Sequence, residues 1–366
     1  FDTIADTGGN DTVRFGDALN LNNLALRVTS ENGILTAHVR ALDDCGCEMD
    51  DQGFDFAVGV DTNGGYVSPI EQFRLADGTL LTFNDLLIKS VVTTVRPQTR
   101  TVITGRDDDI IYAGPTSDLI RSGTGNDIVY AFAARDTVYG EGGNDALLGG
   151  TGADTLDGGC GYNILAGGGG QDVLRAGDRN NLFLGGAGSD QVFAGAGNDF
   201  IAGGRQDDTI TTGAGSNVVA FNKQDGRDTI LASAGACNSL SLGGGLSYGD
   251  LGFMRSGNDL VLDAGGSDAI TFKDWYASLA NRSFVTLQMI EEASADYAPV
   301  GTDVLRDNKV ERFDFQKLAD SFGQARAANP GLTRWNLMNG LLDAHLGGSD
   351  NAALGGEFAY EYGQSG

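Results

Sequence analysis

Aspartate recurs at a fixed interval through the middle of this 366-residue sequence. From Thr104 to Ala220 the chain divides into thirteen nine-residue units without an insertion. The sixth position of the units holds ten aspartates and three asparagines. The aspartates are Asp109, Asp118, Asp127, Asp136, Asp145, Asp154, Asp172, Asp190, Asp199 and Asp208, and the asparagines are Asn163, Asn181 and Asn217. Carboxylates gathered at a regular spacing suit a hard cation such as Ca²⁺, which takes roughly six to eight oxygen ligands.

Two other features of the units would position these carboxylates. The eighth position is always apolar, as in Ile111, Leu147 and Val219, which predicts a short strand whose central side chain points inward. The first four positions are rich in glycine, which favours tight turns in conformations that other residues avoid. One unit cannot bury its single large apolar side chain, so we expect the segment to fold as a stacked array.

Units such as GGTGADTLD (149–157) and GGAGSDQVF (185–193) follow the pattern G-G-x-G-x-D-x-U-x. This pattern resembles the RTX, or haemolysin-type, calcium-binding repeat of secreted bacterial proteins. The resemblance implies a mainly β fold with a calcium-bound parallel β-roll, in which two units form one turn and each ion lies between units n and n+2. It also implies calcium ligands from the turn backbone. The turn glycines are Gly123, Gly125, Gly143, Gly150, Gly152, Gly168, Gly170, Gly186, Gly188, Gly195, Gly197 and Gly204.

This geometry predicts that the two edges of the roll differ. One column holds only aspartate: Asp118, Asp136, Asp154, Asp172, Asp190 and Asp208. The other column contains Asn163 and Asn181 as weaker ligands, and an asparagine ladder could satisfy these turns by hydrogen bonds instead of metal. Asp228 is a further weak candidate, and the turn AFAARD (131–136) lacks glycine. We expect about six to nine Ca²⁺ ions. In the alternative, the solenoid stands without metal, although carboxylates stacked ~4.8 Å apart would repel each other.

Two β-rich modules are expected to flank the roll and cover its ends. Residues 1–92 and 221–291 share a D-T-[IV] start and alternating strands, and the roll is assigned to residues 93–220. An acidic insertion at 41–65 surrounds Cys45 and Cys47, which could pair with each other or stay as surface thiols. The insertion itself reads as a solvated loop, with a further calcium or partner site as the alternative.

Residues 292–366 are expected to be helical and to lead to further sequence. Phe315, Leu318 and Phe322 recur at helical spacing, and a second helix is predicted around Trp335–His345. Ser349-Asp350 should cap a third, short helix. The stretch 303–314 weakly resembles an EF-hand loop, with a capped helix start as the default interpretation.

The amino-acid composition limits the classes of binding partner that this chain can have. Asp and Glu outnumber Lys and Arg by 50 to 24, for a formal charge of −26, which disfavours nucleic acid and anionic lipid and favours divalent cations. The sequence shows no apolar run long enough to span a membrane and no signal-peptide pattern, and both ends resemble cuts from a longer chain. Other modules of the same polypeptide, or identical copies, are the expected protein partners.

The sequence points to a structural role and not to an enzyme. It lacks the H-E-x-x-H zinc motif and has only two histidines, His38 and His345. We expect a calcium-binding structural or adhesive module of a large extracellular bacterial surface protein, exported by type I secretion, that folds on calcium outside the cell and assembles into a filament or surface layer. The alternative is the secretion and folding tail of an RTX toxin or hydrolase whose catalytic domain lies elsewhere.

Overall fold

The part of the chain before the roll is described only as backbone strands. The computed structural model describes residues 101–365 apart from 107, 232, 234–236 and 301, and of the first 100 residues only strands β1–β9. These are β1 (Asp2–Ile4), β2 (Thr12–Arg14), β3 (Leu24–Glu31), β4 (Ile34–Leu42), β5 (Glu48–Val60), β6 (Tyr66–Val67), β7 (Gln72–Arg74), β8 (Leu80–Leu81) and β9 (Thr93–Thr94). Cys45, Cys47 and the side chains of the acidic insertion lie outside the described residues.

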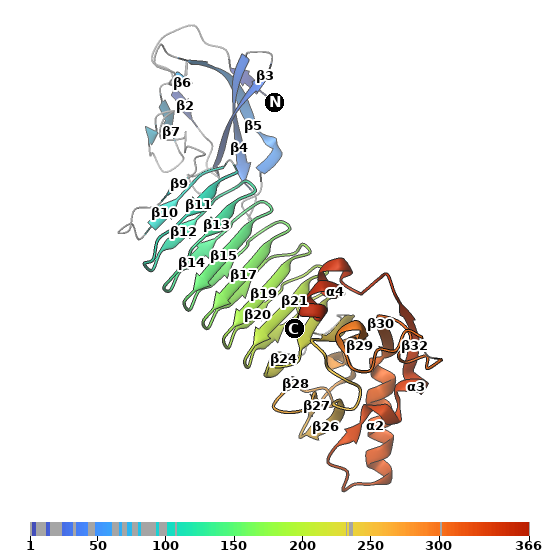
Figure 1. Cartoon of the computed structure of the whole chain (residues 1–366). Helices are drawn as coiled ribbons and strands as arrows, with labels where there is room; N and C mark the ends of the chain where they lie inside the picture. Colours follow the sequence, from blue (N-terminus) through green and yellow to red (C-terminus); the bar gives the residue numbers. More distant parts are fainter. Residues whose placement is uncertain are drawn as a thin grey trace.

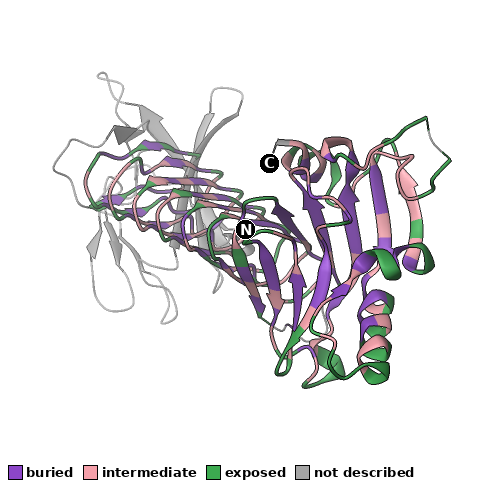
Figure 2. Ribbon diagram, turned by 60° about the horizontal axis from the view of Figure 1, so that its bottom comes forward, coloured by how far each residue is buried: buried purple, intermediate pink, exposed green. Residues whose placement is uncertain are grey.

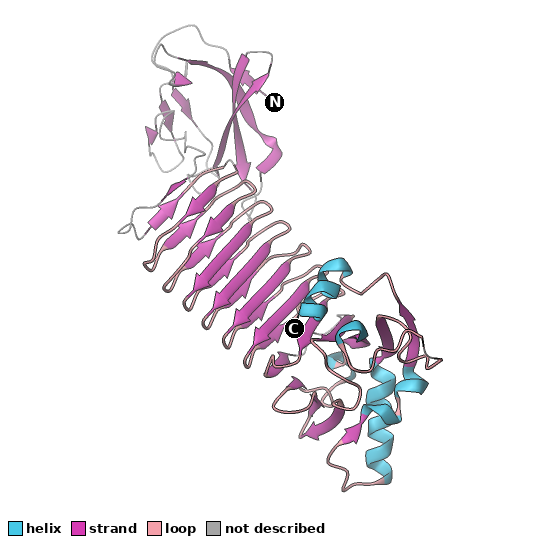
Figure 3. Ribbon diagram, in the orientation of Figure 1, coloured by secondary structure: helices cyan, strands magenta, loops and turns pink. Residues whose placement is uncertain are grey.

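A parallel β-solenoid of about eight turns, residues 101–243, forms the centre of the molecule and confirms the predicted mainly β fold (Figures 1 and 3). One sheet contains β10 (Thr101–Ile103), β12 (Leu119–Arg121), β14 (Thr137–Tyr139), β16 (Thr155–Asp157), β18 (Val173–Arg175), β20 (Gln191–Phe193) and β22 (Thr209–Thr211). The other contains β11 (Ile110–Tyr112), β13 (Ile128–Tyr130), β15 (Ala146–Thr151), β17 (Ile164–Gly169), β19 (Leu182–Ala187), β21 (Phe200–Arg205) and β23 (Val218–Asn222). We call these the even sheet and the odd sheet, because the units that supply their strands are even-numbered and odd-numbered when the unit that begins at Thr104 is counted as the first.

Each strand pairs with the strand two units away. Leu119 lies opposite Thr137 in the even sheet, and Ile128 lies opposite Ala146 in the odd sheet. All eighth-position side chains from Ile111 to Val219 are buried between the two sheets, at most 2% exposed. Figure 2 shows this buried interior running along the roll. The predicted unit phase and the n to n+2 pairing are therefore confirmed.

The turns have the backbone conformation that glycine favours. All twelve turn glycines named from the sequence have positive φ, from +82° at Gly195 to +150° at Gly152. The turn without glycine keeps this conformation, since Phe132 has φ +76° and Ala134 has φ +80°. A residue with a Cβ incurs a free-energy cost at positive φ. Because Phe132 and Ala134 adopt positive φ despite this cost, the neighbouring turns of the stack must impose their geometry on the 131–136 turn.

The stacked sheets continue past Ala220 into the C-terminal part. In the even sheet β24 (Arg227–Leu231) and β28 (Ala269–Phe272) follow β22 in parallel, and then β27 (Asp259–Asp263), β26 (Gly252–Ser256) and β31 (Trp335–Asn336) add antiparallel. In the odd sheet β25 (Asn238–Gly243) and β29 (Phe284–Ile290) follow β23, and β30 (Val310–Asp314) and β32 (His345–Ser349) add antiparallel. The C-terminal part thus completes the same two sheets.

Short helices pack on this end. Helix α2 (Phe315–Ala328) is where the periodicity predicts it, and Asp314 caps it by accepting a 2.9 Å hydrogen bond from Lys317 N. Asp314 is therefore a helix cap, as in the default interpretation of the 303–314 stretch. Phe315 packs edge-to-face against Phe253 and Phe272, so the apolar face of α2 is buried within this chain.

The structure differs from the expected second and third helices. The Trp335–His345 segment forms β31, a short 3₁₀ turn at Leu337–Asn339, the one-turn helix α3 (Leu341–Ala344) and then β32. Trp335 pairs as a strand because Phe253 lies opposite it in β26, and this tertiary contact overrides the helical spacing. Ser349 closes a turn by accepting hydrogen bonds from Asn351 N and Ala352 N, and the last helix, α4 (Gly356–Ser365), begins later.

Candidate metal centre

The sixth-position side chains form two continuous hydrogen-bonded ladders inside the turns. In the all-aspartate column, the backbone N–H of Asp136 donates to Oδ1 of Asp154 at 2.7 Å, and Asp154 N–H donates to Asp172 Oδ1 at 2.8 Å. The same bond repeats from Asp118 to Asp208 and on the other edge from Asp109 to Asn217. Each ladder bond uses one side-chain oxygen.

The second carboxylate oxygen has no such partner in most of the units. Oδ2 is buried and without a hydrogen bond in Asp127, Asp136, Asp145, Asp154, Asp172, Asp190, Asp199 and Asp208. These side chains are at most 2% exposed. A buried ionised oxygen without a partner is costly, so a column of such oxygens favours the binding of a cation or a proton beside each one.

A turn carbonyl borders the same space as each of these oxygens. A Cβ added to Gly149 would lie 2.7 Å from Asp154 Oδ2 and 2.7 Å from the carbonyl oxygen of Gly167, which is two units further along. The corresponding distances at Gly185 are 2.6 Å to Asp190 Oδ2 and 2.3 Å to Gly203 O. Glycine leaves this space open. A carboxylate from one turn and a carbonyl from the next are the oxygen ligands that Ca²⁺ prefers, so the residues fit this ion.

Backbone oxygens are needed to complete such sites. Among the residues that the structure describes, no three His, Cys, Asp or Glu side chains gather closely enough to hold a metal ion by themselves. The fit therefore rests on one carboxylate per turn together with the glycine-rich backbone, as the resemblance implies.

Burial raises the pKa of the ladder carboxyl groups, because the ionised form loses its hydration. The backbone hydrogen bond to each group lowers the pKa in part, and neighbouring carboxylates of the same column raise it further in Asp136, Asp145, Asp172 and Asp208. The pKa is about 6 for Asp127, Asp136 and Asp190, about 7 for Asp172 and Asp199, and about 8 for Asp145 and Asp208. A bound divalent cation would favour the ionised forms.

The asparagine positions keep the ladder bond and differ from the aspartates in their second side-chain atom, the amide Nδ2. Asn163 N–H donates to Asn181 Oδ1 at 2.8 Å, and Asn181 Nδ2 donates to the Arg179 carbonyl at 2.5 Å. Beside Asn163, the space at Gly158 is bordered by the amide Nδ2, which carries hydrogen and repels a cation. The predicted asparagine ladder is confirmed, and this stretch of the odd edge offers amide groups in place of carboxylates.

Sequence reasoning missed how the ladders continue beyond the nine-residue units. Asp208 N–H donates to Asp228 Oδ1 at 3.0 Å, which places the weak candidate Asp228 at the end of the aspartate column, and Asn217 N–H donates to Asn238 Oδ1 at 3.3 Å. The spacings there are 20 and 21 residues, so a search for period nine misses Asn238. A second, exposed ladder at the fifth position, including Asn126 and Asn144, was also missed, although its 18-residue period was a usable signal.

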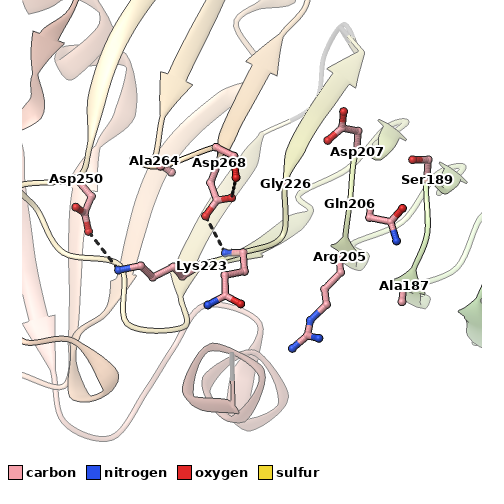
Figure 4. Close-up of a pocket in the computed structure, with 14 residues that line it drawn as sticks. Ala187, Ser189, Arg205, Gln206, Asp207, Lys223, Gly226, Asp250, Ala264 and Asp268 are labelled. Atoms are coloured by element: carbon pink, nitrogen blue, oxygen red, sulfur yellow. Dashed lines mark hydrogen bonds and ion pairs between the residues drawn. The ribbon is translucent and has the colours of Figure 1, made fainter.

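A pocket of about 890 Å³ lies where the roll meets the C-terminal strands (Figure 4). Lys223 Nζ lies 3.9 Å from Asp250 Oδ2, and Asp268 Oδ2 accepts a 2.8 Å hydrogen bond from Gln224 N–H. These contacts serve the junction between the two parts. The pocket contains none of the sixth-position residues of the ladders.

One hydrolase-like pentapeptide was overlooked in the sequence. Gly245–Gly249, with Ser247 at its centre, has the G-x-S-x-G spacing of a serine nucleophile turn. That motif needs a strand-to-helix turn, whereas here the chain runs from β25 to β26. Ser247 Oγ donates to Asp250 Oδ2 at 2.9 Å, and His345 Nε2 lies 2.7 Å from Glu311 Oε2. Ser247 thus stabilises a turn.

The fold and the ladders define a parallel β-roll whose turns offer carboxylate and carbonyl oxygens of the kind that Ca²⁺ prefers. Comparison with known families agrees, since overlapping segments that together cover residues 101–219 match the family described as the RTX calcium-binding nonapeptide repeat. The roll is therefore an array of RTX calcium-binding repeats. A search of curated proteins gave no match. Within the described residues, no helix is long and apolar enough to cross a membrane.

Proposed function

We propose that this chain is a calcium-dependent structural module of a large bacterial surface protein, and that the roll folds when calcium binds outside the cell. The observation that carries the proposal is the set of eight buried Oδ2 atoms without partners, each within a turn of an RTX repeat. Such oxygens are compatible with a stable fold when a cation, or a proton, occupies the space beside them.

Net charge supports calcium as a folding ligand. Eight divalent ions would add sixteen positive charges and bring the formal charge from −26 to −10. Without them, the carboxylates of each column would repel one another in the folded state, while the unfolded chain keeps them apart. Binding energy that exists only in the folded state becomes folding energy.

The place of folding follows from calcium concentration. Extracellular calcium modules bind with dissociation constants of about 10⁻⁴ to 10⁻³ M, so the ion-poor cytosol leaves them empty while calcium-rich surroundings fill them. A chain that is unfolded inside and folded outside suits export through the narrow channel of type I secretion. In this proposal the module has a structural or adhesive role and no catalytic one, and it binds six to nine calcium ions.

The test is circular dichroism of the purified chain in EGTA and then in millimolar calcium, with ions counted by isothermal titration. We expect little β signal in chelator and a cooperative gain on adding calcium. Magnesium at the same concentration is the control, because it demands a tighter octahedral site and should not replace calcium. An unchanged β spectrum in EGTA would show that the roll stands without metal.

A further inference from the structure

Most cationic side chains of the C-terminal part contact a carboxylate, as expected in a chain whose acidic residues outnumber its basic ones by 50 to 24. The pairs are Lys223 with Asp250, Lys273 with Asp259, Arg282 with Asp320, Arg306 with Asp296, Lys309 with Glu292 and Arg334 with Asp263. Arg255 and Arg326 are among the cations that form no ion pair with a described residue. These two arginines lie beside the same tyrosine.

Strand β26 and helix α2 bring Arg255 and Arg326 to one place (Figure 1). Phe253 of β26 packs against Phe322 of α2, with ring centres 6.0 Å apart. Arg255 follows Phe253 by two residues, so both lie on the same face of the strand. Arg326 follows Phe322 by about one helical turn, and its guanidinium lies 5.9 Å from the Phe322 ring centre. The two arginines therefore extend the contact between this strand and this helix.

Tyr276 is the residue that these arginines share with a third one, Arg282. Its backbone N–H donates a 2.9 Å hydrogen bond to the carbonyl of Asn258, at the end of the β26–β27 hairpin. The guanidinium of Arg255 lies 4.2 Å from the Tyr276 ring centre, and that of Arg282 lies 5.9 Å from it. Burial raises the pKa of Tyr276, and the charges of all three arginines lower it in part. We call the three arginines and Tyr276 the arginine cluster.

One acid balances the arginine cluster only in part. Asp320 Oδ1 accepts a 3.1 Å hydrogen bond from Arg282 Nη1, and the Asp320 charge acts on the Tyr276 hydroxyl against the arginines. Three guanidinium groups and this carboxylate leave a formal charge of +2, although the whole chain carries −26. A local excess of positive charge in so acidic a protein is complementary to a doubly charged anion.

The arginine cluster also contains hydrogen-bond donors without acceptors. The Tyr276 hydroxyl and Nε of Arg282 are buried and form no hydrogen bond, and the same holds for Nε1 of Trp275, whose ring lies 5.9 Å from the Arg282 guanidinium. Buried donors without acceptors cost free energy, so they favour a ligand that supplies acceptor oxygens. Arg255 is exposed, and its long side chain can move away from Tyr276 to admit such a ligand.

We propose that the arginine cluster binds a doubly charged oxyanion, the charge of a free sulfate ion or of a phosphate monoester. Guanidinium groups hold such oxygens in paired, charge-assisted hydrogen bonds that are stronger than neutral ones. A single carboxylate would leave one of the two excess positive charges without a partner. A phosphate monoester carries about −1.5 to −2 at pH 7, so it satisfies the same count as sulfate. The site takes anions, and it is independent of the number of calcium ions in the roll.

The test is isothermal titration of the full chain with sulfate and, separately, with glycerol phosphate, in saturating calcium and at constant ionic strength. We expect saturable binding at one site per chain. Binding of glycerol phosphate would assign the site to phosphate groups attached to a larger molecule, and binding of sulfate alone would assign it to the free ion. Absence of binding by both probes would overturn the proposal.

Single substitutions locate the binding. Arg255→Gln and Arg326→Gln should each weaken it about tenfold through the loss of a charge-assisted hydrogen bond. Arg227→Gln is the matched control, because it removes the same charge from an exposed position of β24, and it should leave the affinity unchanged. Equal weakening by the control and the cluster variants would show that the anion responds only to net charge. Circular dichroism in calcium checks the fold of each variant.

Asp320→Asn separates a binding role of the arginines from a purely structural one. The Asp320 side chain is 62% exposed, so the fold should tolerate this change. Removal of its negative charge should strengthen anion binding several-fold, whereas arginines that only stabilise the contact between β26 and α2 would gain nothing. Tyr276→Phe keeps the ring, and it should weaken binding because the hydroxyl donor is lost. Unchanged or weaker binding by Asp320→Asn would overturn the site, even if an arginine variant fails to fold.

Discussion

The backbone amide of Asp136 donates a 2.7 Å hydrogen bond to Oδ1 of Asp154, 18 residues further along the chain. This bond leaves Asp154 Oδ2 buried beside Gly149, with the carbonyl of Gly167 on the other side of the same space. One oxygen of the aspartate thus fixes the stacking of two turns, and the other is available to an ion. The two roles of the side chain can be separated by substitution.

Removing one aspartate of the all-aspartate column should remove bound calcium. Asp154→Ala or Asp172→Ala deletes the carboxylate shared by two adjacent gaps, so we expect the loss of one to two ions per chain and lower cooperativity in isothermal titration. Asn163→Ala is the control. It also breaks a buried bond to Asp145 N–H, at a cost of about 1–3 kcal/mol, but should leave the ion count unchanged. Equal losses at the two kinds of position would contradict the difference between the edges.

Two neighbouring glycines in one turn should respond very differently to alanine. In Gly170→Ala the new Cβ would lie 1.3 Å from the carbonyl oxygen of Gly152, at a φ of +143°, so the turn cannot accept it without moving. In Gly169→Ala the Cβ meets nothing within 4 Å. We expect Gly170→Ala to lower the melting temperature in calcium by many degrees and Gly169→Ala to change it little. Similar melting temperatures for the two variants would contradict the stacking described here.

The glycine-free turn should be improved by glycine. Ala134 has φ +80°, and a residue with a Cβ pays roughly 1–2 kcal/mol in this region. We therefore expect Ala134→Gly to stabilise the roll by about 1 kcal/mol in calcium, measured by thermal or urea unfolding. Ala153→Gly, where φ is not positive, is the control and should destabilise by about 0.5–1 kcal/mol through added chain entropy. A lower stability of Ala134→Gly than of the parent chain would contradict the inference that the backbone at Ala134 is strained.

A buried glutamate makes the C-terminal part sensitive to pH. Burial first, and then the charges of Asp296 and Glu311, raise the pKa of Glu291 to about 8. The unfolded value is near 4.3, so the folded state binds the extra proton and its stability falls as the pH rises from about 4 towards 8. Glu291→Gln stays neutral and escapes this loss.

The measurement compares melting temperatures in saturating calcium at pH 5 and pH 7.5. We expect Glu291→Gln to melt above the parent chain at pH 7.5 and the difference to shrink at pH 5. Glu292→Gln, which loses a half-buried ion pair with Lys309, is the control, and its small difference should not depend on pH in this range. A difference for Glu291→Gln that stays constant with pH would exclude the ionisation of this group as its cause.

Much of the roll could be predicted because its information is local and repeated. The apolar column from Ile111 to Val219 and the turn glycines follow from period nine alone, and the structure places them as predicted. The asparagine ladder at Asn163 and Asn181 was also predictable, since an amide can replace a carboxylate in a hydrogen bond but not as an ionic ligand.

The sequence-based predictions that failed concern segments whose structure depends on contacts with distant parts of the chain. Trp335 has helical spacing to Met338 and Leu342, yet Phe253 in β26 pairs with it as a strand. Asn238 joins the odd ladder after an irregular spacing of 21 residues, which no fixed period detects. The outward side chains of the odd sheet are apolar, which was readable at the seventh and ninth positions, but only once odd and even units are known to face different sides.

The pairing of each residue with the one 18 positions away determines which changes of length the chain can absorb. Loss of 18 residues within the array would join equivalent edges, so the aspartate column and the apolar outer face of the odd sheet would both stay continuous in a shorter roll. Loss of nine residues would shift every later unit to the opposite sheet, joining aspartate turns to asparagine turns and the apolar outer face of the odd sheet to the more polar one of the even sheet. Insertions and deletions within the array should therefore occur in pairs of nine-residue units.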